Sequence, residues 1–125
     1  LHWLRVALPA LKAQKRGQVV ITSSAAALRA CPEQALYAAS KFALQGLALS
    51  LRAELKGTGV KVASVNPGAV ATPWWTDPSR GGYSESKRAE LGTMPMLAPE
   101  DVASQIVALL EQPSSSNIEN VVMDP

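Results

Sequence analysis

A tyrosine and a lysine four residues apart form the strongest chemical signal in this sequence. Tyr37 and Lys41 lie in the segment Tyr-Ala-Ala-Ser-Lys, within a stretch whose Ala- and Leu-rich composition predicts a helix. At this spacing both side chains project from one face of a helix, one turn apart. A phenol ordinarily loses its proton at about pH 10, and a nearby ammonium favours the charged phenolate. The pair could therefore move a proton near neutral pH, although such a pair is also common by chance on helix surfaces.

A serine located 13 residues before the tyrosine supplies a second polar group. Ser24 follows the run Gly17–Thr22, whose β-branched residues predict a strand buried on both faces. A hydroxyl at the end of that strand could polarise the oxygen of a substrate carbonyl. Ser23 is the neighbouring alternative, favoured only if the spacing is counted one residue short.

A third group of residues follows the next predicted strand, which spans 60–65. The segment Pro67-Gly68-Ala69-Val70-Ala71-Thr72 breaks that strand at its carboxyl end. Its backbone groups and the Thr72 hydroxyl could hold a flat amide.

The elements that must position these residues alternate between helices and strands. The predicted order is a helix over 1–14, a strand over 17–22, a helix over 34–56, a strand over 60–65, a loop over 68–98 with one short helix, a helix over 99–112 and a strand over 117–123. Such alternation predicts an α/β fold with parallel strands, right-handed crossovers and helices on both faces. Ligands bind such sheets at the carboxyl ends of the strands, so both polar loops belong to one edge.

Together these motifs resemble the short-chain dehydrogenase/reductase family. The resemblance rests on Gly17–Ser24, Tyr37–Lys41, Asn66–Thr72 and the helix start at Leu97–Ala103, so nearly the whole chain is in register. It implies a partial Rossmann-like, doubly wound parallel sheet, comprising the last three strands and their helices. It also implies an NAD- or NADP-dependent interconversion of a carbonyl and an alcohol on a small molecule. The related extended group of epimerases and dehydratases shares the Tyr/Lys pair, but its chains continue further after the tyrosine helix.

The resemblance also implies a role for each residue. Tyr37 would be the catalytic acid and base, Lys41 would favour its phenolate, and Ser24 would stabilise the developing oxyanion. The cofactor-binding residues would be Tyr37, Lys41, Pro67, Gly68, Val70 and Thr72, with the Val70 backbone at the nicotinamide carboxamide. Residues 73–96 would cover the substrate.

The Gly-rich phosphate-binding turn of the family does not occur in these 125 residues, nor do its adenine-side loops or its active-site asparagine. The sequence also opens inside a helical pattern, without a Met or a capping residue. We therefore expect residues 1–125 to be the carboxyl-terminal part of a single Rossmann-like domain whose amino-terminal cofactor-binding half is missing. Two functions stay open: an oxidoreductase, or a catalytically silent fragment with only a structural or interaction role.

Composition argues against several other classes. A formal net charge of +2, with scattered basic residues, indicates no nucleic-acid surface. The single histidine and single cysteine have no metal-ligand spacing, so we expect no metal site, and one cysteine favours a reducing, cytoplasmic setting. No apolar run has membrane-spanning length, so we expect no membrane partner. The apolar 34–56 helix, which the family commonly pairs across subunits, predicts a homo-oligomer in the full-length form.

The roles of three further residues stay open. Cys31 lies between Ser24 and Tyr37, where the family places substrate-facing residues. Trp74 and Trp75 could face the substrate or pack on the core.

Overall fold

A computed structural model describes residues 2–80 and 84–125. Its elements are α1 (His2–Ala13), β1 (Gly17–Thr22), a 3₁₀ turn η1 (Ala25–Ala27), α2 (Ala35–Leu55), β2 (Val60–Pro67), α3 (Pro73–Thr76), α4 (Glu85–Leu91), α5 (Pro99–Leu110) and β3 (Asn120–Met123). The alternation of helices and strands predicted from the sequence is confirmed.

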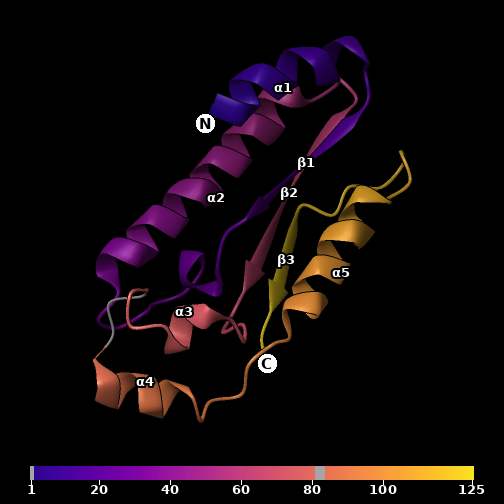
Figure 1. Cartoon of the computed structure of the whole chain (residues 1–125). Helices are drawn as coiled ribbons and strands as arrows, with labels where there is room; N and C mark the ends of the chain where they lie inside the picture. Colours follow the sequence, from indigo (N-terminus) through magenta and orange to yellow (C-terminus); the bar gives the residue numbers. More distant parts are fainter. Residues whose placement is uncertain (1, 81–83) are drawn as a thin grey trace.

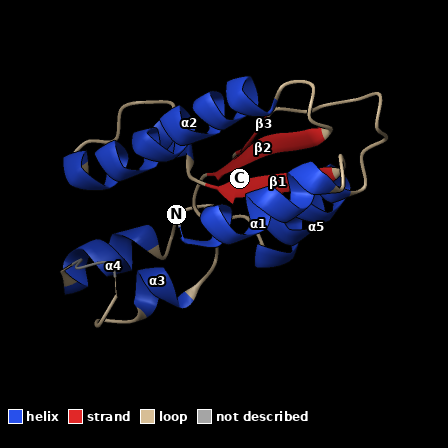
Figure 2. Ribbon diagram, turned by 90° about the horizontal axis from the view of Figure 1, so that it is seen from above, coloured by secondary structure: helices blue, strands red, loops and turns tan. Residues whose placement is uncertain are grey.

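The three strands form one parallel sheet in the order β1-β2-β3 (Figure 1). β1 pairs with β2 from Gly17 opposite Val60, and β3 pairs with the other side of β2 from Asn120 opposite Ser64. Because the strands are parallel, their carboxyl ends share one edge of the sheet. The short helices α3 and α4 lie beside one another beyond this edge (Figures 1 and 2).

Helices cover both faces of the sheet. On one face, Leu51 and Leu55 of α2 pack with Val62 of β2, and leucines of α1 border this cluster. On the other face, Leu109 of α5 packs with Val65 of β2. Neighbouring strand residues point to opposite faces, so β2 is buried between α2 and α5, which flank the sheet in Figure 1. This confirms the predicted doubly wound α/β arrangement.

Several boundaries differ from the prediction. β2 continues to Pro67 because β3 pairs with it as far as that residue. The loop over 68–98 contains two short helices, α3 and α4, where one was expected; Pro73 begins α3, and Glu85 lies in the first turn of α4. The last helix ends at Leu110 and the last strand begins only at Asn120. Gln112 accounts for part of this difference, because its side chain bonds the Leu109 carbonyl and the Ile118 N–H in the connection.

Within the described residues, no helix combines the length and the apolar character that crossing a bilayer demands.

Candidate active site

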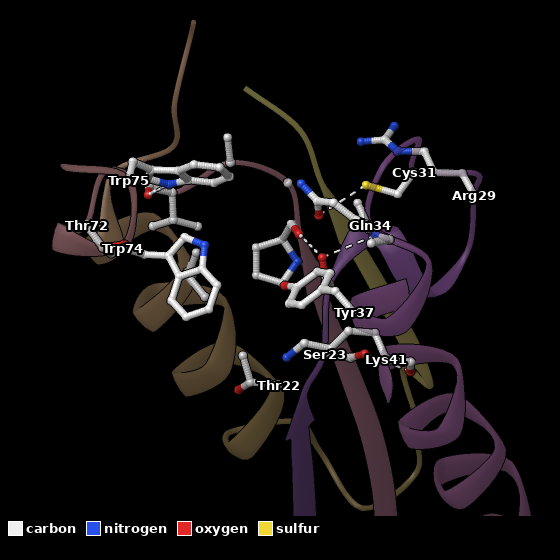
Figure 3. A pocket seen from close by; sticks show the side chains of 18 of the residues that line it. Thr22, Ser23, Arg29, Cys31, Gln34, Tyr37, Lys41, Thr72, Trp74 and Trp75 are labelled. Carbon is white, nitrogen blue, oxygen red and sulfur yellow. Dashed lines mark hydrogen bonds between the residues drawn. The ribbon is translucent and has the colours of Figure 1, made fainter. Parts of the chain in front are cut away.

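A cavity of about 610 Å³ opens at the carboxyl edge of the sheet, a volume within the usual range of small-molecule sites. Its lining comes from the end of β1 with η1, the start of α2, the segment after β2, α3 and the start of α5. Figure 3 shows the side chains around it. The structure brings every residue predicted for the site to this cavity: Ser24, Tyr37, Lys41, Pro67, Gly68, Val70 and Thr72.

Tyr37 and Lys41 share one face of α2 near its first turn. The Lys41 ammonium lies 5.4 Å from the centre of the Tyr37 ring, within the range of a cation–π attraction. Tyr37 is 37% exposed, and Lys41 is half-buried. The phenol therefore remains accessible from the cavity, with a positive charge beside it.

The two serines after β1 are both buried, but their hydroxyls make different bonds. Ser24 Oγ accepts the Ala26 N–H at 3.2 Å, which caps η1, and donates to the Pro67 carbonyl at 3.5 Å. Ser23 donates to the main-chain carbonyl of Lys41 at 3.2 Å. Ser24 thus connects the loops that follow β1 and β2, whereas Ser23 ties the end of β1 to α2.

The segment after β2 is fixed by main-chain bonds on two sides. The Gly68 N–H donates to the Met123 carbonyl at 2.7 Å. Val70 forms an isolated parallel bridge with Leu97, which bonds the peptide groups at 69 and 71. This bridge does not use the Val70 peptide groups, and the Val70 carbonyl accepts the indole N–H of Trp75 at 2.7 Å. The Val70 backbone therefore faces away from Leu97.

A buried polar cluster holds β2 immediately before this segment. Asn66 is fully buried and bonds the side chains of Gln45 and Asn120 as well as the Val121 carbonyl. Buried amides that find all their partners specify one arrangement of the surrounding backbone. The cluster therefore fixes the position from which Pro67 leaves the sheet.

Two parts of the lining were not predicted from the sequence. Gln34 borders the cavity, and its side-chain oxygen accepts the Cys31 thiol at 3.3 Å. Helical spacing could have revealed Gln34, since it precedes Tyr37 by three residues. Arg29 forms a bidentate ion pair with Asp124, which lies 95 residues later in the chain. The distance from Arg29 Nη1 to Asp124 Oδ2 is 2.9 Å. No local sequence pattern signals so distant a partner.

The ion pair between Arg29 and Asp124 shifts the pKa values of both residues at the edge of the cavity. Hydrogen bonding from the Arg29 guanidinium holds the pKa of the Asp124 carboxyl below its usual range. The same bond raises the pKa of Arg29. Cys31, Trp74 and Trp75 also line the cavity. Among residues 2–80 and 84–125, no cluster of three His, Cys, Asp or Glu side chains could hold a metal ion.

A parallel sheet with helices on both faces, and a ligand-sized cavity at its carboxyl edge, defines a Rossmann-like α/β protein. The polar groups around this cavity include a phenol, an ammonium and a buried hydroxyl, which together suit proton transfer. The chain belongs to the short chain dehydrogenase family, whose model matches residues 1–81.

Comparison with curated proteins gives relatives of different lengths. An uncharacterized oxidoreductase of Staphylococcus epidermidis is 32% identical over 125 residues, covering all of this chain and 50% of that protein. The short-chain dehydrogenase/reductase homolog YusR of Bacillus subtilis is 35% identical over 113 residues, covering 88% of this chain and 83% of that protein. The chain thus spans about half the length of the staphylococcal relatives it matches.

Solved structures show the same fold. Serine dehydrogenase, in a closed form with NADP+, superposes with a TM-score of 0.84 at 26% identity, covering 95% of this chain and 48% of that one. A mutant of 4-hydroxyisoleucine dehydrogenase, complexed with NADH and succinate, gives a TM-score of 0.77 at 27% identity, covering 96% and 51%.

Proposed function

We propose that this chain carries the proton-transfer part of an NAD- or NADP-dependent oxidoreductase that interconverts a carbonyl and an alcohol on a small molecule. The observation that carries this proposal is the placement of Tyr37, Lys41 and Ser24 around one cavity, with the Lys41 ammonium 5.4 Å from the Tyr37 ring. Family membership supports it, as do the nicotinamide cofactors bound by serine dehydrogenase and 4-hydroxyisoleucine dehydrogenase.

The residues present fit the nicotinamide end of such a cofactor. The bridge to Leu97 uses the peptide groups at 69 and 71, so the Val70 N–H is left to meet the oxygen of a flat carboxamide. Pro67, Gly68 and the half-buried Thr72 would complete this uncharged side of the site. Tyr37 and Lys41 would bind the ribose hydroxyls. When bound, the cofactor would supply or accept the hydride.

In the reductive direction, Tyr37 would give its phenolic proton to the carbonyl oxygen while the carbonyl carbon receives the hydride. The substrate would thereby be reduced to an alcohol by the hydride from the cofactor, and Tyr37 would be left as a phenolate. Lys41 would stabilise this phenolate by its positive charge. The Ser24 hydroxyl would turn from the Pro67 carbonyl to the developing oxyanion, where such a donor has its largest effect. Oxidation of an alcohol would follow these steps in reverse.

The proposal also concerns the extent of the chain. Residues 1–125 would form the carboxyl-terminal part of one Rossmann-like domain, since the chain spans half of its staphylococcal relatives and contains no Gly-rich phosphate-binding turn. A catalytically silent fragment is the second candidate, favoured by the same half-length match. The full-length form would be cytoplasmic. It would also be a homo-oligomer, which the exposed side chains of Leu36, Phe42 and Leu49 on α2 support.

The test uses an enzyme in which the 125-residue chain follows the half of the S. epidermidis relative that it does not cover, here named the reassembled enzyme. Consumption of NADH or NADPH is followed with a panel of ketones and aldehydes. Tyr37→Phe should lower turnover by about 10²–10⁴-fold, because only the proton-transfer group is lost, with nucleotide affinity nearly unchanged. Turnover at the parent rate in the Phe variant would refute the assignment of Tyr37.

A further inference from the structure

The wall of the cavity across from α2 is aromatic and held in place. α3 contributes Trp74 and Trp75 to the lining, and Figure 3 shows both on the side opposite Gln34 and Cys31. The Trp75 indole N–H donates to the Val70 carbonyl at 2.7 Å. Pro73 begins the helix with a backbone dihedral already suited to it. This anchoring leaves Trp74, with 43% of its surface exposed, presented at the cavity on a fixed turn.

The rim of the cavity offers little to a negatively charged substrate. Arg29 and Lys41 are the basic side chains of the described lining. Arg29 is already bound by both carboxylate oxygens of Asp124, and Lys41 lies against the Tyr37 ring. Asp124 offsets the positive charge of Arg29, so a substrate carboxylate or phosphate would be attracted to this guanidinium less strongly.

The remaining lining is largely small and apolar. It includes Ala25, Ala26, Ala30, Ala69, Val70 and Val102. Such a surface accepts an apolar body without leaving polar groups unpaired. An indole beside such a surface should bind an aromatic ring more tightly than a saturated ring of the same size. Two aromatic rings attract each other more than their buried area alone accounts for.

From these features we propose that the site takes an uncharged carbonyl substrate whose reacting carbon is attached to an aromatic ring, and that Trp74 determines this specificity by stacking on the ring. The inference rests on the proposed function, since it names the substrate class of the same cavity. Trp75 acts as a positioning residue, because its bond to Val70 sets the place of α3.

The experiment compares three probes in the reassembled enzyme. Acetophenone has an aromatic ring on the carbonyl carbon, and cyclohexyl methyl ketone has a saturated ring of similar size. Phenylglyoxylate has a carboxylate in place of the methyl group of acetophenone. Trp74→Leu keeps an apolar side chain but removes the aromatic face, and Trp74→Phe restores an aromatic face. Trp3→Leu is the matched control, because Trp3 is 85% exposed on α1 and is not among the residues described as lining the cavity.

The parent should prefer acetophenone over both other probes. Trp74→Leu should lower kcat/KM for acetophenone about twofold to twelvefold, the size expected of an aromatic pair, and should change kcat/KM for the saturated ketone clearly less. Trp74→Phe should recover most of the loss, and Trp3→Leu should have no effect. Equal losses for both ketones would overturn the stacking role. A preference for phenylglyoxylate that Arg29→Gln abolishes would overturn the uncharged substrate class.

Ligand-observed NMR of acetophenone binding in the same proteins separates this inference from the proposed function, because it requires no turnover. Binding that weakens in Trp74→Leu but not in Trp3→Leu, with no hydride transfer to any carbonyl, would sustain the aromatic site and reject the oxidoreductase. If ketones are turned over, but neither their turnover rate nor the binding of acetophenone depends on residue 74, the oxidoreductase is supported and the aromatic site is rejected.

Discussion

The hydroxyl of Ser24 lies 3.5 Å from the carbonyl oxygen of Pro67, 43 residues further along the chain. This contact joins the loops that follow β1 and β2, and both loops border the cavity. The neighbouring hydroxyl of Ser23 is bonded to the Lys41 main chain instead. The two serines therefore form a matched pair whose hydroxyls donate to different main-chain carbonyls.

Ser24→Ala in the reassembled enzyme should lower kcat by about 10²–10³-fold, the usual effect of removing one donor from an oxyanion. Ser23→Ala should lower it by less than about tenfold, because that hydroxyl serves the backbone of α2. Steady-state kinetics with a ketone substrate measures both variants. A larger loss in Ser23→Ala than in Ser24→Ala would reverse the assignment of the two residues.

The second prediction separates the charge of Lys41 from its hydrogen bonds. Lys41→Met should slow alcohol oxidation, since the positive charge 5.4 Å from the centre of the Tyr37 ring is lost. It should also weaken cofactor affinity about tenfold or more, as expected for a lost charged hydrogen bond. Lys41→Arg keeps the charge, so oxidation should slow less in this variant. An unchanged oxidation rate with unchanged cofactor affinity in the Met variant would mean that Lys41 is only a surface residue.

The third prediction concerns the turn that brings β2 alongside the end of α1. Gly57 and Gly59 both have positive φ angles, of 80° and 81°. A Cβ on Gly59 would lie 2.0 Å from the Lys15 carbonyl oxygen, whereas a Cβ on Gly57 would meet nothing within 4 Å. Gly57→Ala should therefore cost only the backbone strain, about 1–2 kcal/mol. Gly59→Ala should cost about 1–3 kcal/mol more through overpacking.

Urea unfolding of the reassembled enzyme measures the two costs side by side. Equal destabilisation by the two alanines would mean that the contact between Gly59 and the α1–β1 connection adds nothing to stability.

Sequence reasoning predicted the helices and the strands because each depends on local periodicity, whereas the candidate site residues came largely from the resemblance to the family. Tyr37 and Lys41 are one helical turn apart, and β-branched runs mark β1 and β2. It did not reach Gln45, whose side chain joins a buried cluster with Asn66 that only the packing of α2 on the sheet creates. Nor did it reach the Arg29–Asp124 pair, since the two residues meet only through the return of β3 to the edge of β2.

The last prediction concerns the 125-residue chain by itself. Among the described residues β1 has β2 as its only partner, although Val19 and Ile21 face the α2 cluster and Val20 faces the α5 cluster. On the same strand, the Gln18 side-chain nitrogen is buried with no hydrogen-bond partner in the described part of the chain. An edge strand with apolar residues on both faces is a template for aggregation.

The chain alone should therefore be poorly soluble or molten, and should neither bind NADH or NADPH tightly nor reduce carbonyls. The nicotinamide contacts would be present, but the helix N-terminus and Gly-rich turn that neutralise a pyrophosphate would not. Calorimetric titration with both cofactors and amide hydrogen exchange test this, with the reassembled enzyme as the positive control. Micromolar binding together with strong protection at Val19, Val20 and Ile21 would show that the chain is self-sufficient. Activity that appears only in the reassembled enzyme would show that the dinucleotide must be held by residues outside this chain.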